Sequence, residues 1–251
     1  MLFVSEDLCK SLGLDENLKA KLEALCKLNE NSALTLHKTD RLCLTLDNDP
    51  KLKPLCFDFL SDKFIYRLNQ GGRKKENLAK AVMSGLSSPI VFDATAGMGR
   101  DSFILQHAGC KVYMFERNIV IWLLLRDALQ RAIGDATLTH LVNPFPILMS
   151  CGEVACYTGD IIPDVIYYDP MFPERKKSAL VKKEMRIFKE LIGADEDIEA
   201  TLRILVQKAR HKVILKRPQT AKPIFLDKIK PIGSVDGGAC RFDIYMHQDL
   251  L

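Results

Sequence analysis

Hydrophobic and polar positions follow two different patterns along the chain, and the change falls near residue 70. Before it, apolar residues recur at helical spacing over residues 15–28 and then alternate with polar ones in two short runs, 33–37 and 41–46. The alternation predicts two strands, and the turn-forming residues between them predict a hairpin. A further short strand is expected at residues 56–59. This first part therefore reads as a small α/β unit.

Beyond residue 76, apolar strand-like runs alternate with helical patterns. Such alternation is typical of βαβ units and a mainly parallel sheet. The expected strands cover residues 90–93, 111–116, 147–150, 164–169 and 212–216. The expected helices cover residues 76–83, 101–107, 119–132, 177–191 and 198–209.

The end of the chain differs from this alternation. A Gly-Gly turn lies between the short apolar runs 233–235 and 241–246. Such a turn predicts a hairpin, so the last strand is expected to be antiparallel to its neighbours. A second break, the glycine-rich basic segment 70–75 (QGGRKK), predicts a flexible turn and a boundary. We therefore expect a small N-terminal α/β domain over residues 1–70 and a larger domain over residues 71–251.

Composition narrows the class of protein. The chain has 251 residues, of which 47% are hydrophobic, enough for a substantial core. No apolar run is long enough to span a bilayer, and the first residues lack the basic segment of a signal peptide. The eight cysteines form no Cys-x-x-Cys pair and no zinc or disulfide pattern. Buried thiols in a reduced cytoplasmic protein, with no bound metal, are the expectation.

Basic charge is concentrated late in the chain. The net charge is only +4, but the segment from Arg203 to Lys222 has seven basic residues and no acidic one. Residues 171–190 add seven basic residues against three acidic ones. Such a concentration indicates a polyanionic substrate, although a solvated helix face gives the same count.

A glycine-containing loop follows the expected strand 90–93. Residues 93–101 read DATAGMGRD, so Asp93 ends the strand, and Gly97 and Gly99 allow the backbone to turn tightly and approach a ligand. The helix expected from Asp101 offers unpaired amides at its start. A dinucleotide site would have a third glycine where Ser102 stands, and Asp93 would repel a pyrophosphate. The loop fits the cationic methionine end of S-adenosylmethionine better.

The next two strands end in residues that could complete a cofactor site. Glu116 follows a strand and comes 19 residues after Gly97, the spacing at which an acidic residue holds ribose hydroxyls in nucleotide-binding folds. Arg100 and Arg117 flank these acidic positions. Cys151 and Gly152 follow the strand after that, where loops would reach the adenine edge, and a buried thiol is the alternative interpretation of Cys151.

A second motif follows the strand 164–169. Residues 169–173 read DPMFP. The Asp169 carboxylate and the Pro170 carbonyl can accept the two hydrogens of an exocyclic amino group on a base, and Phe172 offers a face for stacking. A strand-to-loop turn with a core phenylalanine is the competing interpretation. An adenosine-containing cofactor beside a nucleobase pocket indicates methyl transfer to an exocyclic nitrogen.

These motifs resemble those of class I S-adenosylmethionine-dependent methyltransferases. Residues 169–173 are a relative of the Asp/Asn-Pro-Pro-Tyr/Phe signature of amino-methyltransferases, with Met171 in place of the second proline. The longer runs 93–101, 177–186, 216–218 and 241–245 are similar to the bacterial RsmJ family, which methylates N2 of a guanine near the 3′ end of small-subunit ribosomal RNA. The resemblance covers roughly residues 40–246, and the first 40 residues match poorly.

The resemblance implies a Rossmann-like methyltransferase sheet, a cytoplasmic enzyme, and 16S rRNA or the small ribosomal subunit as partner. The chemistry of the second motif places catalysis on Asp169, Pro170 and Phe172. The candidate cofactor residues are Asp93, Gly97, Gly99, Arg100, Asp101, Glu116, Arg117, Cys151, Gly152 and Asp169. The candidate RNA-binding residues are Arg175, Lys176, Lys177, Lys182, Lys183, Arg186, Lys216 and Arg217.

Three other functions stay open at this point. An N6-adenine methyltransferase of DNA or RNA would use the same pair of acceptors. A non-catalytic RNA-binding protein could retain the fold, although intact Gly97, Gly99, Glu116 and Asp169 argue against loss of activity. A nicotinamide dehydrogenase fits least well, because the third glycine is missing and the second motif has no place in it.

Overall fold

The computed structural model describes residues 2–28, 33–172, 187, 191, 195, 197–226 and 229–246. Contacts divide the chain into two compact units. The larger unit contains residues 59–117, 133–170 and 196–251, and the smaller contains residues 1–58, 118–132 and 171–195. Each is described by itself below. The predicted domain boundary at residue 70 stays a prediction.

The larger unit is built on a seven-stranded sheet with the order β10-β11-β9-β8-β5-β6-β7. β5, β6, β7, β8 and β9 are parallel, and the last strand, β11, is antiparallel to both of its neighbours, β9 and β10, as predicted. Their bounds are β5 Ile90–Asp93, β6 Lys111–Met114, β7 Ile147–Leu148, β8 Val165–Tyr168, β9 Lys212–Pro218, β10 Gly233–Asp236 and β11 Cys240–Met246. The predicted α/β class is therefore confirmed.

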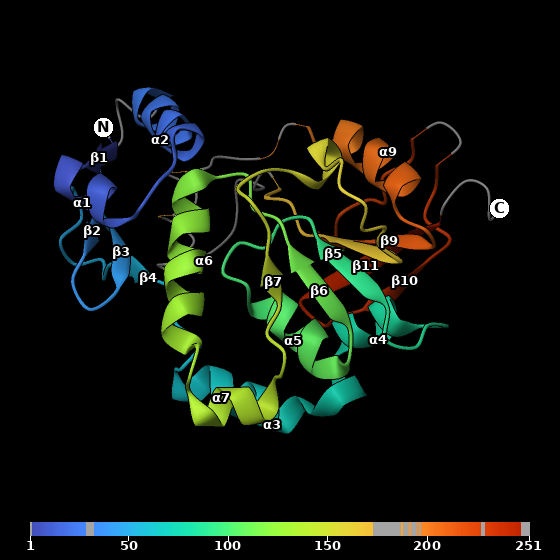
Figure 1. Ribbon diagram of the computed structural model, residues 1–251. Coiled ribbons are helices and arrows are strands. Elements are labelled where there is room, and N and C mark those ends of the chain that lie inside the picture. The colour runs from blue at the N-terminus through green and yellow to red at the C-terminus, as the bar shows by residue number, and fades with distance from the viewer. Residues whose placement is uncertain are drawn as a thin grey trace. The chain divides into compact units, whose positions relative to one another are not determined.

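Helices cover both faces of this sheet, which explains why its central strands are apolar throughout. α4 (Asn77–Met83) and α5 (Arg100–Ala108) lie on one face and α9 (Ile198–Lys208) on the other (Figure 1). All four residues of β8 are buried. α3 (Asp62–Lys75) and α7 (Ala136–Leu141) pack outside α5, and a short 3₁₀ helix, η1, covers Val154–Cys156.

The order of the strands creates a switch point between β5 and β8. From β5 the chain builds outward through β6 to β7, then returns to add β8 and β9 on the other side of β5. Ligands of open α/β sheets bind outside the carboxyl ends of the strands at such a point. The two sequence motifs follow β5 and β8, so both lie at this position.

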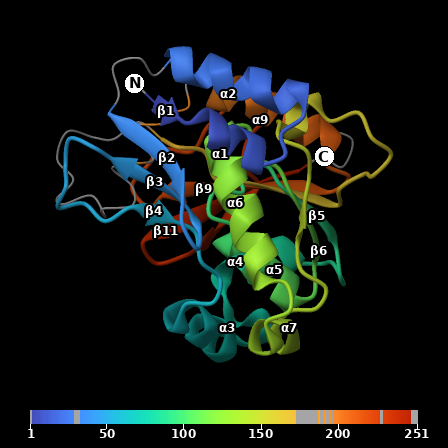
Figure 2. The same cartoon turned by 60° about the vertical axis from the view of Figure 1, so that its left-hand side comes forward.

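The smaller unit has a four-stranded sheet, β1-β2-β3-β4, with α1 (Glu6–Ser11), α2 (Glu16–Leu28) and α6 (Ile119–Ala132) (Figure 2). The predicted hairpin is confirmed as β2 (Leu34–Lys38) and β3 (Leu42–Leu46), and β1 (Leu2–Val4) adds in parallel to β2. α6 packs on β3, where the buried Asp127 carboxylate accepts the Leu42 amide and pairs with Arg131.

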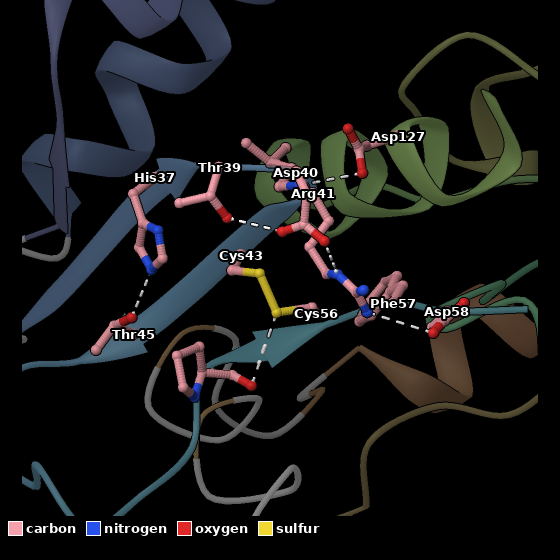
Figure 3. The surroundings of a disulfide bond; sticks show 12 residues. His37, Thr39, Asp40, Arg41, Cys43, Thr45, Cys56, Phe57, Asp58 and Asp127 are labelled. Carbon is pink, nitrogen blue, oxygen red and sulfur yellow. Dashed lines mark hydrogen bonds and ion pairs between the residues drawn. A yellow bond between two sulfur atoms is a disulfide. The ribbon is translucent and has the colours of Figure 1, made fainter. Parts of the chain in front are cut away.

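A disulfide joins Cys43 to Cys56 in this unit, so the expectation of buried thiols was wrong for these two residues (Figure 3). Cys43 on β3 and Cys56 on β4 (Leu55–Cys56) are register partners of an antiparallel pair, with Cα atoms 4.5 Å apart. That separation is within the range a disulfide requires. Spacing in the sequence could not reveal it, because the pairing depends on the register of the two strands.

Three local predictions were wrong in extent. Residues 70–75, predicted as a turn, form the last part of α3. That helix is anchored by the buried Phe64 and Leu68, and the Phe64 ring packs against the Phe59 and Phe103 rings, so packing outweighs the local glycine signal. The strands expected at residues 56–59 and 147–150 are only the two-residue β4 and β7.

The helix predicted for residues 177–191 lies largely outside the described residues. Across the part of the chain that the structure does describe, no helix has the length and apolar character needed to cross a membrane.

Candidate active site

The loop between β5 and α5, residues 94–99, is called the glycine loop below. Two of its residues have the left-handed backbone conformation. Gly97 has φ 52° and Gly99, the N-cap of α5, has φ 72°. A side chain at either position would be strained, so glycine is required by the conformation. The loop is tied to its neighbours by hydrogen bonds from the Ala94 amide to the Tyr167 carbonyl and from the Ala96 amide to the Phe115 carbonyl.

Asp93 shapes this loop from the inside. Its side chain accepts hydrogen bonds from the Thr95 amide and the Ser102 hydroxyl, and only 1% of the residue is exposed. Burial raises the pKa of the Asp93 carboxyl to about 7. The sequence offers Asp93 as a direct partner of a cationic cofactor, whereas the structure gives it contacts that hold the glycine loop against α5.

Glu116 links the end of β6 to the same loop. Its Oε2 accepts the Gly97 amide at 3.0 Å, and its backbone carbonyl accepts the Gly152 amide at 2.9 Å. The residue is 7% exposed. Glu116, Gly97 and Gly152 therefore come together as the sequence predicted, from the ends of three adjacent parallel strands.

Arg117 and Cys151 lie beside Glu116. The Arg117 guanidinium pairs with Glu153 at 3.2 Å and Asp197 at 3.1 Å, and the buried Cys151 thiol donates to the Arg117 carbonyl. Arg117 thus faces carboxylates across the ends of β6, η1 and α9. Arg100 begins α5 and is half-buried.

Asp169 connects the second motif to the first. Its backbone amide donates to the Thr95 hydroxyl at 2.7 Å, so the residue following β8 is joined to the loop following β5. About a third of the Asp169 side chain, 35%, is open to solvent. Thr95 and Asp169, 74 positions apart in the sequence, are therefore in direct contact, and the two motifs lie next to each other.

Lys216, which the sequence analysis placed among the RNA-binding residues, contacts both Asp169 and Asp101. Lys216 Nζ donates to Asp169 Oδ2 at 2.8 Å and to Asp101 Oδ2 at 3.0 Å. The Tyr167 hydroxyl also donates to Asp101 Oδ2, at 2.7 Å. The sequence groups Lys216 with RNA-binding cations because it lies in a basic run. The position of Lys216 on β9, the neighbour of β8, could have indicated that it lies near Asp169. It could not have indicated that Asp101 and Asp169 are its hydrogen-bond partners.

Of the other residues predicted to bind RNA, the structure describes only Arg217. Arg217 is buried and donates to the Lys222 carbonyl, so it does not present a surface cation, contrary to the expectation from charge alone. Burial lowers the pKa of its guanidinium. The others lie outside the described residues: Arg175, Lys176, Lys177, Lys182, Lys183 and Arg186.

The remainder of the second motif extends into the smaller unit. Pro170 is buried at the end of the larger unit. In the smaller unit, the Met171 amide donates to Asp195 Oδ2 and the Asp195 amide donates to the Met171 carbonyl. Phe172 is half-buried there. This exchange of hydrogen bonds fixes the backbone directly after Pro170.

Comparison with known proteins identifies relatives of this arrangement. A family model described as "Putative SAM-dependent methyltransferase" matches residues 17–247. Among solved structures, a SAM-dependent methyltransferase from Neisseria gonorrhoeae superposes with a TM-score of 0.63 at 26% sequence identity, covering 93% of each chain.

Curated relatives match at higher identity. A ribosomal RNA small subunit methyltransferase J of Haemophilus influenzae is 41% identical over 243 residues, covering 92% of each chain. The protein of the same name from Pseudoalteromonas atlantica is 42% identical over 230 residues, covering 87% of each chain. These matches span both motifs and both units.

Glu116 provides a test of the cofactor site. Glu116→Gln keeps the shape but removes the charge, so it should weaken S-adenosylhomocysteine binding about 5- to 150-fold, as expected for a charge-assisted hydrogen bond worth ~1–3 kcal/mol. Isothermal titration measures this, with the exposed Glu199→Gln as matched control. NAD binding by the unmodified protein, without S-adenosylhomocysteine binding, would contradict the assignment.

Proposed function

Since the chain belongs to the ribosomal RNA small subunit methyltransferase J family, we propose that it methylates the exocyclic N2 of a guanine near the 3′ end of 16S ribosomal RNA. Its cofactor is S-adenosylmethionine. One observation supports this site above others: Asp169, at the end of β8, is hydrogen-bonded through Thr95 to the glycine loop. An acceptor for amino hydrogens is thereby fixed beside a loop suited to a nucleoside cofactor.

The residues around the loop suit such a cofactor. Bound S-adenosylmethionine supplies an electrophilic methyl group. Gly97 and Gly99 permit close approach of the backbone, and Glu116 offers a carboxylate at the position where ribose hydroxyls are held. Asp101 lies in the first turn of α5. Arg100, Arg117, Cys151 and Gly152 complete the proposed set around the same strand ends.

The target base requires orientation more than proton removal. Its exocyclic nitrogen is a poor nucleophile because the lone pair is delocalised into the ring. Asp169 and the Pro170 carbonyl accept the two amino hydrogens, which turns the lone pair towards the methyl group. The Asp169 carboxylate then stabilises the positive charge that develops on nitrogen, and Phe172 stacks on the base.

RNA binding is assigned to the basic segment that follows the second motif. Residues 175–186 carry six basic side chains and follow the proposed catalytic residues directly in the chain. Contacts between such cations and phosphates dominate the affinity of nucleic-acid complexes. We place the protein in the cytoplasm with its ribosomal substrate. The Cys43–Cys56 disulfide is unusual for that compartment, and we assign it no part in the reaction.

Asp169→Asn should separate catalysis from binding. The substitution keeps the shape but loses the charge and presents an amide that can donate. Methyl transfer should fall at least tenfold, which corresponds to ~1.4 kcal/mol of transition-state stabilisation, while RNA affinity changes little. The measurement is single-turnover transfer of labelled methyl to undermodified small subunits or rRNA.

A matched control for this variant is Asp164→Asn, the same change at the amino end of β8. Asp164 accepts the Ile90 amide and pairs with Arg210, so its loss should affect stability rather than transfer. A wild-type transfer rate in Asp169→Asn would remove Asp169 from the mechanism and favour a non-catalytic RNA-binding role.

Charge reversal at Lys182 and Lys183 should weaken RNA binding and reduce its dependence on salt. Each phosphate contact that is lost removes counterion release, so the slope of affinity against salt should become shallower. Cofactor binding should not change. Filter binding over a salt series measures both quantities, with the exposed Lys80 and Lys111 reversed together as control. Equal affinity at every salt concentration would show that the segment does not contact RNA.

A further inference from the structure

The ammonium group of Lys216 is paired with two carboxylates and is mostly buried. Its Nζ contacts Asp169 Oδ2 at 2.8 Å and Asp101 Oδ2 at 3.0 Å, and 27% of its side chain is exposed. The residue is central in the sheet, because β9 lies between β8 and β11. A phosphate approaching Nζ would meet two carboxylates first, so these contacts argue against a phosphate-binding role.

The two carboxylate oxygens of Asp169 differ in their hydrogen-bond partners. Oδ2 accepts the Lys216 ammonium, whereas no donor reaches Oδ1 among the residues that the structure describes. The backbone of Asp169 is fixed independently by the Thr95 hydroxyl. The side chain is therefore held at one oxygen and offers the other, which is the geometry needed to accept a hydrogen from a substrate amino group.

We propose that Lys216 is a positioning residue for methyl transfer: it holds Asp169 through Oδ2 and leaves Oδ1 to the amino group of the base. This inference rests on the proposed function, since it assumes that Asp169 accepts the amino hydrogens. It moves Lys216 from the RNA-binding set to the catalytic site.

Electrostatics explains why a cation is needed at this position. Burial raises the pKa of the Asp169 carboxyl, and the neighbouring Asp101 raises it further, while Lys216 lowers it. Burial alone would lower the pKa of Lys216, but its two carboxylate partners raise it above the ordinary value. The Asp101 and Asp169 carboxylates both contact Lys216 Nζ. Without the positive charge of that nitrogen, their mutual repulsion would favour protonation of one of them.

Other titratable groups also act on this cluster. Among the described residues they include Asp101 on α5, Tyr167 on β8, Asp93 on β5, Cys240 on β11 and Arg67 on α3. Asp93, with a pKa of about 7, and the Tyr167 phenol, whose pKa burial raises, are largely uncharged in weakly acidic solution. Lys216 is thus the cation in direct contact with Asp169 among the described residues.

The test is the pH dependence of single-turnover methyl transfer at saturating cofactor. Transfer needs ionised Asp169, so the rate falls as pH drops below its pKa. Lys216→Met and Lys216→Gln raise that pKa and should move the acid limb of the profile upward by about one pH unit or more, a tenfold change in the ionised fraction for each unit. Their rate deficit should be largest near pH 6 and should narrow as pH rises.

Three comparisons separate this role from a structural one. Lys216→Arg keeps the cation and should leave the acid limb near its wild-type position. Asp101→Asn removes the neighbouring carboxylate and should move the limb the opposite way, to lower pH. Lys212→Met removes another lysine of β9, one that donates to the Ala81 and Ser84 carbonyls, and should lower stability without moving the limb.

Circular dichroism at each pH confirms that the variants are folded. An acid limb at the wild-type pH in every folded variant would overturn the role of Lys216 while leaving the proposed function intact. No methyl transfer by the unmodified protein to undermodified small subunits would instead contradict the proposed function itself.

Discussion

The adjacency of β5 and β8 is the constraint on which the site depends. These strands are parallel neighbours, with Asp93 in register with Tyr167, so the segments that leave their carboxyl ends must meet. The Ala94 amide and the Thr95 hydroxyl then tie the glycine loop to the end of β8. β6 and β9 flank the pair and bring Glu116 to one side and Lys216 to the other. The positions that we propose for the cofactor and the base are thereby set by the order of the strands, because both loops leave adjacent strand ends.

A second requirement is that the buried carboxylates of the site are balanced by a positive charge. Asp101 and Asp169 both lie beside the switch point, and burial opposes the ionisation of each. Lys216 and the Tyr167 hydroxyl lower the pKa of Asp101, and Lys216 does the same for Asp169. Removing one member of such a cluster leaves an uncompensated charge, which costs more than an exposed ion pair is worth. The arrangement thus couples the geometry of the site to its protonation state.

Much of this site could be predicted from sequence because strand ends are easy to recognise. Asp93, Glu116 and Asp169 each follow an apolar run, and parallel strands bring their carboxyl ends to one edge. The partner of Lys216 could not be predicted, because a basic run resembles a solvated face until the order of β8 and β9 is known. The Cys43–Cys56 disulfide depends likewise on strand register, and the course of α3 through residues 70–75 depends on aromatic packing near Phe64.

The most direct test of the central claim is mass mapping of methylated nucleosides in small-subunit rRNA from cells with and without this protein. The account predicts the loss of one N2-methylguanosine near the 3′ end, restored when the gene is returned, with every other methylated nucleoside unchanged. An unaltered methylation map would contradict it, and loss of an N6-methyladenosine instead would show that the same site acts on a different base.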